Sequence, residues 1–428
     1  MISPRHSLGA LTTALVLAGC GQQMSTPAQS GTSADSPAQA ASAQGISATG
    51  QLHRRYKPVD CGFDTGKGRC HAQVVVDASG KPLVTSTPAG YGPTQMRHAY
   101  GFDALSATGA GQTIAIVDAY NDPSIVNDLG VFKAQYGISG CNLKVVNQSG
   151  GANLPRTNSG WAQEISLDVE WACAIAPQAN ILLVEASSAS LSNLLAGVDY
   201  AAKNANVVSM SFGGGDSGST SYDYHFNVPG RSFVASSGDN GNGTSYPATS
   251  PYVLAVGGTH LPLDGSGNRT GSETVWSGSG GGISSSESEP GYQTSYGISN
   301  TGGKRGSPDV AYNADPQTGV AVYDSTPNQG VSGWLVFGGT SAGAPQWSAM
   351  IARADSGRST PLATSSSNTS PFYGAATGST TYGSNYLDVT SGTNGTCGNV
   401  CTAGTGYDLT TGVGSPKAAT LVPYLQSH

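Results

Sequence analysis

Five short apolar runs alternate with helical patterns along this 428-residue chain, and they constrain the fold more than any other feature. Each run is short and almost purely apolar, as expected of strands that are buried on both faces. The strand candidates are Thr113–Val117, Ile181–Glu185, Val207–Met210, Phe233–Ala235 and Val253–Val256, and the helix candidates are Trp161–Ile175 and Leu191–Lys203. This alternation predicts an α/β fold with a mainly parallel central sheet flanked by helices.

A glycine-rich segment, Phe337-Gly-Gly-Thr-Ser-Ala-Gly-Ala-Pro345, presents Ser341 in the manner of a serine nucleophile. A nucleophilic serine needs a base, and the usual base is histidine. The seven histidines of the chain are scattered, and no His-Gly-Thr motif precedes the serine. Carboxylates are therefore the candidate bases.

Two carboxylates stand four residues apart on the first predicted helix. Glu164 and Asp168 lie on the apolar stripe that includes Trp161 and Ile175, and Pro177 ends the helix. Burial of two neighbouring carboxylates raises the pKa of at least one of them and costs stability. A purely structural purpose therefore explains the pair poorly. A solvated acidic face is the alternative, and we expect Glu170, which lies off the stripe, to belong to such a face.

Five motifs in this order resemble the sedolisin family, the serine-carboxyl peptidases. They are Glu-x-x-x-Asp on a helix, Ser-Phe-Gly-Gly, Ser-Gly-Asp, Ala-Val-Gly-Gly-Thr and Gly-Thr-Ser-x-x-x-Pro, and they fall between Tyr91 and Pro416. The resemblance implies a subtilisin-like three-layer fold over residues 91–428.

The resemblance also implies roles for individual residues. Ser341 matches the nucleophile, Glu164 the general base and Asp168 the carboxylate that orients the base and shares its proton. Asp239 matches the acid that donates a hydrogen bond to the oxyanion. The segments that would bind an extended peptide beside the nucleophile contain Ser211, Phe212, Gly213, Gly214, Gly281 and Gly282.

The chemistry of these roles requires acid. A carboxylate accepts a serine proton only when burial and a neighbouring acid raise its pKa, and a carboxyl group donates to an oxyanion only when it is neutral. The two coupled carboxylates should titrate as a unit. Asp118 follows the first strand, where a subtilisin places the aspartate of its triad, but the partner histidine is absent. We therefore assign Asp118 a structural role.

Two oxygen-rich loops near the C-terminus match the calcium site of the family. Asp388 and Asp408 would contribute side-chain ligands, and Val389, Gly404 and Gly406 would contribute carbonyl oxygens to one structural Ca²⁺ ion. Two turn-forming aspartates are the alternative. Asp122 and Asp309 are expected to cap or turn the chain.

The first ninety residues predict export. Residues 1–20 resemble a signal peptide of the lipoprotein type that ends at Cys20, and residues 21–50 form a disordered tether rich in Ser, Ala and Gln. The family typically carries a long folded propeptide. Residues 51–90 are too few for that, so they are either a short N-terminal segment or a reduced propeptide. The chain would then be secreted, or lipid-anchored at the bacterial cell envelope, and a monomer is the default expectation.

Cysteine number and charge support this compartment. Six cysteines follow Cys20, and an even number in an exported chain suggests disulfides. Fifteen connectivities are formally possible. Proximity favours the pairs Cys61–Cys70, Cys141–Cys173 and Cys397–Cys401. A formal charge of −7 and the lack of any basic run argue against a nucleic-acid partner.

The expected function is therefore an exported, acid-acting endopeptidase that cleaves protein or peptide substrates through an acyl-enzyme on Ser341. A tripeptidyl exopeptidase of the same fold is the first alternative. A catalytically inactive surface binding protein and a neutral subtilisin-type protease are the others, and the complete carboxyl set and the missing histidine motif argue against them.

Overall fold

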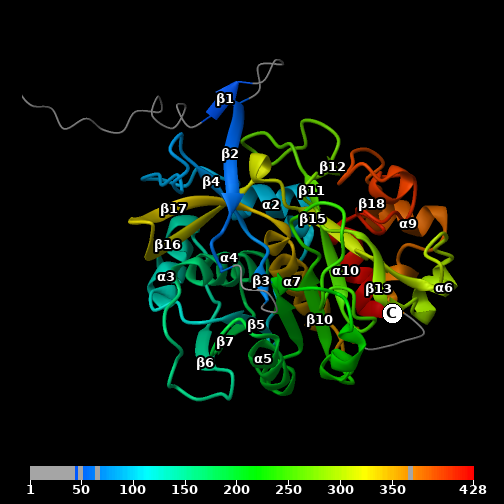
Figure 1. The fold of residues 1–428 in the computed structure, drawn as a ribbon, viewed down its shortest axis with the longest axis horizontal. Coiled ribbons are helices and arrows are strands. Elements are labelled where there is room, and N and C mark those ends of the chain that lie inside the picture. Colours follow the sequence, from blue (N-terminus) through cyan, green and yellow to red (C-terminus); the bar gives the residue numbers. More distant parts are fainter. Residues whose placement is uncertain (1–43, 47–51, 63–67, 365–369) are drawn as a thin grey trace, which may run out of the picture.

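The computed structural model describes residues 44–46, 52–62, 68–364 and 370–428, which fold around a central sheet (Figure 1). The sheet order is β12-β11-β10-β8-β5-β7-β6, and β15 pairs with β11. Every pairing is parallel except that of β11 with β12. The bounds are β5 Thr113–Ala119, β6 Leu143–Asn147, β7 Asn180–Ala186, β8 Val207–Met210, β10 Ser232–Ser236, β11 Leu254–His260, β12 Thr274–Val275 and β15 Val310–Asn313. The predicted strands are confirmed.

Helices cover this sheet, so the predicted subtilisin-like α/β fold is also confirmed. Helix α4 (Ser159–Ile175) packs on α7 (Ala344–Asp355) and on β5, whereas α5 (Leu191–Asn204) packs on β5 and β7. Helix α4 begins at Asn158, whose side chain accepts hydrogen bonds from two backbone N–H groups of the first turn. Residues 160–175 of this helix are all buried.

The prediction of a solvated acidic face on α4 is wrong for Glu170. Its side chain has no exposed surface, and one carboxylate oxygen accepts a hydrogen bond from the backbone N–H of Tyr323 at 3.0 Å. The reason is that α4 lies in the centre of the molecule, where strand β16 (Val320–Asn328) covers the face that would otherwise meet water.

A second, antiparallel sheet has the order β1-β2-β4-β17-β16. Its remaining strands are β1 Gln44–Ile46, β2 Leu52–Pro58, β4 Gln73–Val76 and β17 Val331–Gly338. Figure 1 shows β1 and β2 rising from the body at one edge of this sheet. The predicted disordered tether therefore ends in a strand at residues 44–46, because β1 pairs with β2. The predicted signal peptide, Cys20 and the rest of the tether lie outside the described residues.

Shorter elements complete the fold. The strands are β3 Arg69–Cys70, β9 Phe212–Gly213, β13 Gly282–Ser288, β14 Lys304–Ser307, β18 Tyr386–Leu387 and β19 Ser415–Pro416. The helices are α2 Pro93–Tyr100, α3 Ile125–Tyr136, α6 Gly291–Tyr296, α8 Pro371–Gly374, α9 Ser379–Asn385 and α10 Ala418–Ser427. Short 3₁₀ helices are η1 Phe102–Ala104, η2 Ser219–His225, η3 Pro316–Thr318, η4 Thr340–Ala342 and η5 Gly398–Cys401. In the described ranges no helix has the length and apolar character needed to span a membrane.

Three disulfides join the cysteine pairs that proximity favours. They are Cys61–Cys70, Cys141–Cys173 and Cys397–Cys401. The first closes a loop between β2 and β4, and the second joins the end of α4 to the segment before β6.

A buried ion pair links strand β14 to the residue that precedes strand β15 of the central sheet. The Arg305 guanidinium donates to both carboxylate oxygens of Asp309 at 2.6 and 2.8 Å, and both side chains are almost fully buried. Asp309 also accepts hydrogen bonds from Ala255 N and the Tyr373 hydroxyl. The aspartate that we expected to cap or turn the chain is therefore part of a buried polar network.

We predict that Asp309→Asn lowers the free energy of unfolding by about 3–5 kcal/mol, because it leaves the Arg305 charge buried without its partner. Denaturant unfolding of the purified protein measures this change. Asp103→Asn is the matched control, since Asp103 pairs with His98 at the exposed surface, and we expect little change there. Equal effects of the two substitutions would contradict the assignment.

Candidate active site

Ser341 lies in a tight turn between β17 and α7. Gly339 has a φ of 94°, and a Cβ at this position would lie 2.2 Å from the carbonyl oxygen of His71 and 2.5 Å from Oδ2 of Asp239. Only glycine fits both the conformation and this close approach. The turn brings Ser341 against α4, and its side chain has no exposed surface.

Glu164 and Asp168 face this turn from α4, as the i, i+4 spacing predicts. Ser211 Oγ donates to Asp168 Oδ1 at 2.9 Å. The Ser341 hydroxyl points to the carbonyl oxygen of Ser211 at 3.3 Å, so both oxygens of Glu164 are buried without a hydrogen-bond donor. Ser341 is nevertheless close enough to Glu164 to offset part of the rise in its pKa. A small rotation of the serine side chain would direct its hydroxyl to Glu164, and such loose geometry is common in free enzymes.

A third carboxyl group, Asp118 at the end of β5, completes a buried cluster. Burial, followed by the charges of Asp168 and Asp118, raises the pKa of Glu164 well above its ordinary value. Burial and then Asp118 do the same for Asp168, and burial raises the pKa of Asp118 itself to about 8. The structural role expected of Asp118 does not include this proximity, which arises because β5 packs on α4. Protons are shared within the cluster, which must titrate as a unit.

Asp239 follows β10 and is bonded to Thr340, the residue that precedes Ser341. Its Oδ1 accepts hydrogen bonds from the backbone N–H and the hydroxyl of Thr340, both at 2.8 Å, and Gln73 Nε2 donates to its Oδ2 at 3.1 Å. Burial outweighs these hydrogen bonds and raises the pKa of Asp239 to about 7. The carboxyl group is therefore largely neutral in acid.

The predicted substrate-binding residues divide into two groups. Ser211, Phe212 and Gly213 lie along the site, and Phe212–Gly213 form strand β9. The others are bonded to neighbouring loops and strands: Gly214 to Tyr246, Gly281 to Gly243, and Gly282 to Ser307. The strand that pairs with β9 is β3, which belongs to the N-terminal segment of the same chain.

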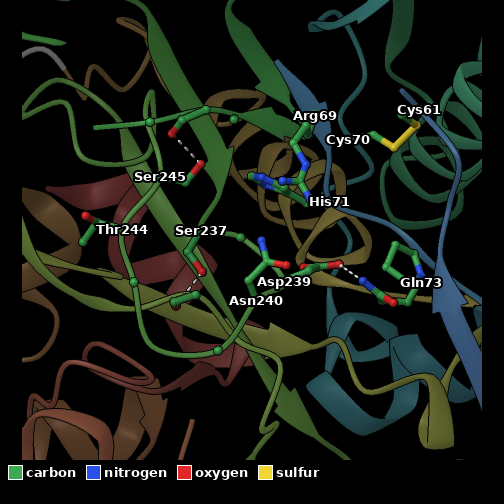
Figure 2. Close-up of a pocket in the computed structure, with 18 of the residues that line it drawn as sticks. Cys61, Arg69, Cys70, His71, Gln73, Ser237, Asp239, Asn240, Thr244 and Ser245 are labelled. Carbon is green, nitrogen blue, oxygen red and sulfur yellow. Dashed lines mark hydrogen bonds between the residues drawn. A yellow bond between two sulfur atoms is a disulfide. The ribbon is translucent and has the colours of Figure 1, made fainter. Parts of the chain in front are cut away.

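Sequence reasoning missed His71 and Gln73, which line a pocket beside the nucleophile together with the turn that carries Ser237 and Asp239 (Figure 2). The Ser341 hydroxyl donates to Ser211 O, whereas Nδ1 of the His71 ring lies 2.8 Å from Ser236 Oγ. Burial lowers the pKa of this ring to about 4. No motif in the sequence indicates that residues so far from Ser341 in the chain enter the site.

The residues of the proposed metal site come together near the C-terminus. Gly406 N donates to Asp388 Oδ2 at 3.0 Å and Gly404 N donates to Asp408 Oδ2 at 3.1 Å, so one loop holds both carboxylates. Asp388 Oδ1 is buried and makes no hydrogen bond of normal geometry, although the Tyr382 hydroxyl is close enough to interact with this carboxylate. Val389 is buried beside it in the chain. An acceptor-only oxygen without a donor fits a hard cation such as Ca²⁺.

We predict that the free energy of unfolding decreases as the pH rises from about 4 toward 8. A carboxyl group whose folded pKa is raised stabilises the fold below its unfolded pKa, and this contribution is lost as the pH rises through the folded pKa, here about 8 for Asp118. Denaturant unfolding at a series of pH values measures the slope. Asp118→Asn should make the slope shallower, and parallel curves for the two proteins would contradict the coupling.

Comparison with known proteins places the chain in a family. A family model described as the subtilase family matches residues 156–367. The chain is 30% identical to kumamolisin of Bacillus sp. (strain MN-32) over 378 residues, which cover 80% of this chain and 64% of kumamolisin. It is 30% identical to sedolisin of Pseudomonas sp. (strain 101) over 403 residues, which cover 84% of this chain and 66% of sedolisin. The chain thus spans just under two thirds of the length of these relatives.

A solved structure has the same fold. It is the structure of Pseudomonas sedolisin, a serine-carboxyl proteinase, complexed with two molecules of pseudo-iodotyrostatin. It matches with a TM-score of 0.67 and 30% sequence identity, over 80% of this chain and 100% of that chain. The order of the motifs, the carboxyl cluster beside Ser341 and these similarities lead to one conclusion: the chain belongs to the sedolisin family.

Proposed function

We propose that this chain is an exported serine-carboxyl endopeptidase that hydrolyses protein or peptide substrates at acidic pH. The observation that supports this most directly is the burial of Glu164 and Asp168 beside Ser341. Such a cluster lowers the free energy of unfolding as the pH rises above the acid range. A catalytic role, in which the carboxylates activate the serine, accounts for this loss of stability.

In this mechanism Ser341 Oγ attacks the carbonyl carbon of the substrate, and Glu164 accepts the hydroxyl proton. Glu164 has no hydrogen-bond donor of its own, so its raised pKa gives it the basicity that an exposed carboxylate lacks. Asp168, held by Ser211 Oγ, and Asp118 supply the coupled acids that share a proton with Glu164. The same proton then passes to the leaving amine, and water hydrolyses the acyl-enzyme.

Asp239 stabilises the oxyanion in its neutral form. Thr340 donates twice to its Oδ1, so the proton is assigned to Oδ2, which lies on the side of Gly339 and accepts one hydrogen bond from Gln73. When Asp239 ionises, its negative charge repels the tetrahedral intermediate. Because its pKa is raised to about 7, activity should decline as the pH rises through that value.

An extended substrate would pair with Ser211, Phe212 and Gly213 as an added strand. The chain's own residues 68–76 pass through the site and continue on both sides of it. A cleft that admits a continuing chain supports internal cleavage over the alternative, a tripeptidyl exopeptidase. The intact set of Ser341 and three carboxyl groups argues against an inactive binding protein.

The remaining parts of the proposal concern compartment and metal. Three disulfides suit an oxidising, extracytoplasmic environment, in agreement with a signal peptide. Lipidation of Cys20 would tether the protein to a membrane, and a monomer is proposed. Asp388 and Asp408 would hold one Ca²⁺ ion, with carbonyl oxygens from Val389, Gly404 and Gly406, and the ion would tie the loop at 404–408 to the segment after β18.

We predict that Ser341→Ala abolishes hydrolysis of a denatured protein substrate in acid. Glu164→Gln and Asp239→Asn should each lower kcat/KM by about 10²–10⁴-fold, since they remove the base and the oxyanion acid. Glu170→Gln is the matched control, because Glu170 is equally buried on α4 but bonds to Tyr323. Retained turnover in Ser341→Ala would refute the proposed function.

We also predict that a chelator lowers the melting temperature of the protein and that added Ca²⁺ restores it. An ion that binds only the folded chain adds stability that grows with the logarithm of the ratio of free ion concentration to the dissociation constant. In Asp388→Asn the chelator should have no effect. A melting curve that does not respond to chelator in the unsubstituted protein would contradict the site.

A further inference from the structure

Three buried carboxylates converge outside the active site, where α3 and β16 pack together (Figure 1). Asp122 follows β5, Asp128 lies on α3, and Asp324 lies on β16. One carboxylate oxygen of each lies within 4.8 Å of an oxygen of each of the other two. None of the three residues is more than 2% exposed. These three residues are called the aspartate cluster below.

Neighbouring polar groups hold two of these carboxylates in place. Thr326 Oγ1 donates to Asp122 Oδ1 at 2.7 Å, and Ser166 Oγ donates to the other oxygen of this carboxylate at 3.2 Å. Ser325 donates twice to Asp128, from its hydroxyl at 2.6 Å and from its backbone N–H at 2.8 Å. These neutral donors fix the direction of both carboxylates without compensating their charge.

Two buried oxygens at this place have no hydrogen-bond donor. Thr326 N donates to Asp324 Oδ1 at 2.8 Å, but Asp324 Oδ2 has no partner. Glu170 on α4 is similar, since Tyr323 N donates to its Oε2 and its Oε1 has no partner. Burial, and less strongly the charges of the aspartate cluster, raise the pKa of Glu170 well above its ordinary value, which places this carboxyl group beside the cluster. Unpaired buried acceptors are costly, and a bound ligand would satisfy them.

The spacing of the three carboxylates fits a cation. Among the described residues, no arginine, lysine or histidine forms an ion pair with any member of the aspartate cluster. Because the three oxygens lie within 4.8 Å of one another, a cation between them can stand within about 2.8 Å of all three. Ca²⁺–oxygen bonds are about 2.3–2.6 Å long, so a contraction of a few tenths of an ångström would complete the coordination.

We propose that Asp122, Asp128 and Asp324 form a second Ca²⁺ site, separate from the one at Asp388 and Asp408. Donors that are all oxygen suit a hard cation, and Ca²⁺ accepts irregular oxygen geometry more readily than Mg²⁺ does. The ion would join three parts of the chain, namely the segment after β5, helix α3 and strand β16. Because β16 also packs on α4, the ion would fix the strand that covers the helix of the proposed base.

This second site is expected to fill only when Ca²⁺ is added. Sites that work in extracellular calcium have dissociation constants of about 10⁻⁴–10⁻³ M. Trace ion in a purified protein leaves such a site empty, so a chelator does not change it. Asp388→Asn, which loses the C-terminal site, is therefore a background in which added Ca²⁺ reports on the aspartate cluster alone.

The first test is thermal unfolding of the full Asp388→Asn chain at neutral pH, with and without added CaCl₂. We expect about 10 mM Ca²⁺ to raise the melting temperature by about 2–5 °C relative to NaCl of equal ionic strength, since the ion binds only the folded chain. MgCl₂ should give a smaller shift. An equal shift with MgCl₂ would overturn the assignment of the ion as Ca²⁺.

The second test locates the ion. Crystals of the unsubstituted chain and of Asp388→Asn are soaked in Tb³⁺, which replaces Ca²⁺ at oxygen sites and scatters anomalously. We expect a peak between the three carboxylates of the aspartate cluster in both crystals. In the unsubstituted chain we expect another peak at the C-terminal site. Neither readout depends on hydrolysis, so the inference is tested apart from the proposed peptidase activity.

Asp324→Asn in the same background separates ion binding from packing. Its amide keeps an acceptor for Thr326 N and removes one of three repelling carboxylates, so without Ca²⁺ it should melt no lower than its parent. It should nevertheless lose the Ca²⁺ shift. Asp355→Asn is the matched control and should keep the shift, because Leu362 N donates to Asp355 Oδ1 and Oδ2 is likewise buried without a donor, but outside the cluster. If Asp324→Asn does not fold, Asp128→Asn takes its place.

The outcomes also separate the two calcium sites. No Ca²⁺ shift and no peak at the aspartate cluster in Asp388→Asn would overturn the second site. A shift that survives Asp324→Asn would overturn it as well, because the ion would then bind elsewhere. A peak at the cluster with none at Asp388 and Asp408 in the unsubstituted chain would overturn the C-terminal site and support the second one.

Discussion

The mutual burial of Glu164, Asp168 and Asp118 is the constraint on which the rest of the site depends. Three carboxyl groups cannot all ionise at one place inside a protein, so the cluster holds protons well above the pH at which free carboxyl groups lose them. The burial itself follows from the position of α4 at the centre of the fold, where it packs on α7 and β5. An acidic environment then favours both the stability of the fold and the proposed chemistry.

The same constraint explains how a serine without a histidine can be activated. The elements that meet at Ser341 differ in origin: Glu164, the proposed base, comes from a helix, Asp239, the proposed oxyanion acid, from a strand end, and Ser341 from a glycine turn. Gly339 lets these parts approach, because its missing Cβ leaves room for Asp239 and for a carbonyl group. This carbonyl belongs to His71 of the same chain, and it also accepts a hydrogen bond from Ser341 N at 3.0 Å.

Much of this could be predicted from local patterns. The apolar runs predicted the strands of the central sheet, the i, i+4 spacing placed Glu164 and Asp168 on one face, and short separations paired the cysteines. Features set by distant packing could not be predicted. Glu170 is buried because β16 covers α4, Asp118 joins the cluster because β5 lies against α4, and β3 enters the cleft through a pairing with β9. None of these contacts leaves a periodic or compositional signal in the sequence.

The most direct test of the central claim is the pH dependence of kcat/KM for the active enzyme on a peptide substrate. Catalysis by the carboxyl cluster predicts activity confined to the acid side, with a decline as Asp239 ionises near pH 7, and a displaced profile in Asp118→Asn. A rate that rises through pH 6.5 to a plateau near pH 8, unchanged in Asp118→Asn, would indicate a histidine base and contradict the account.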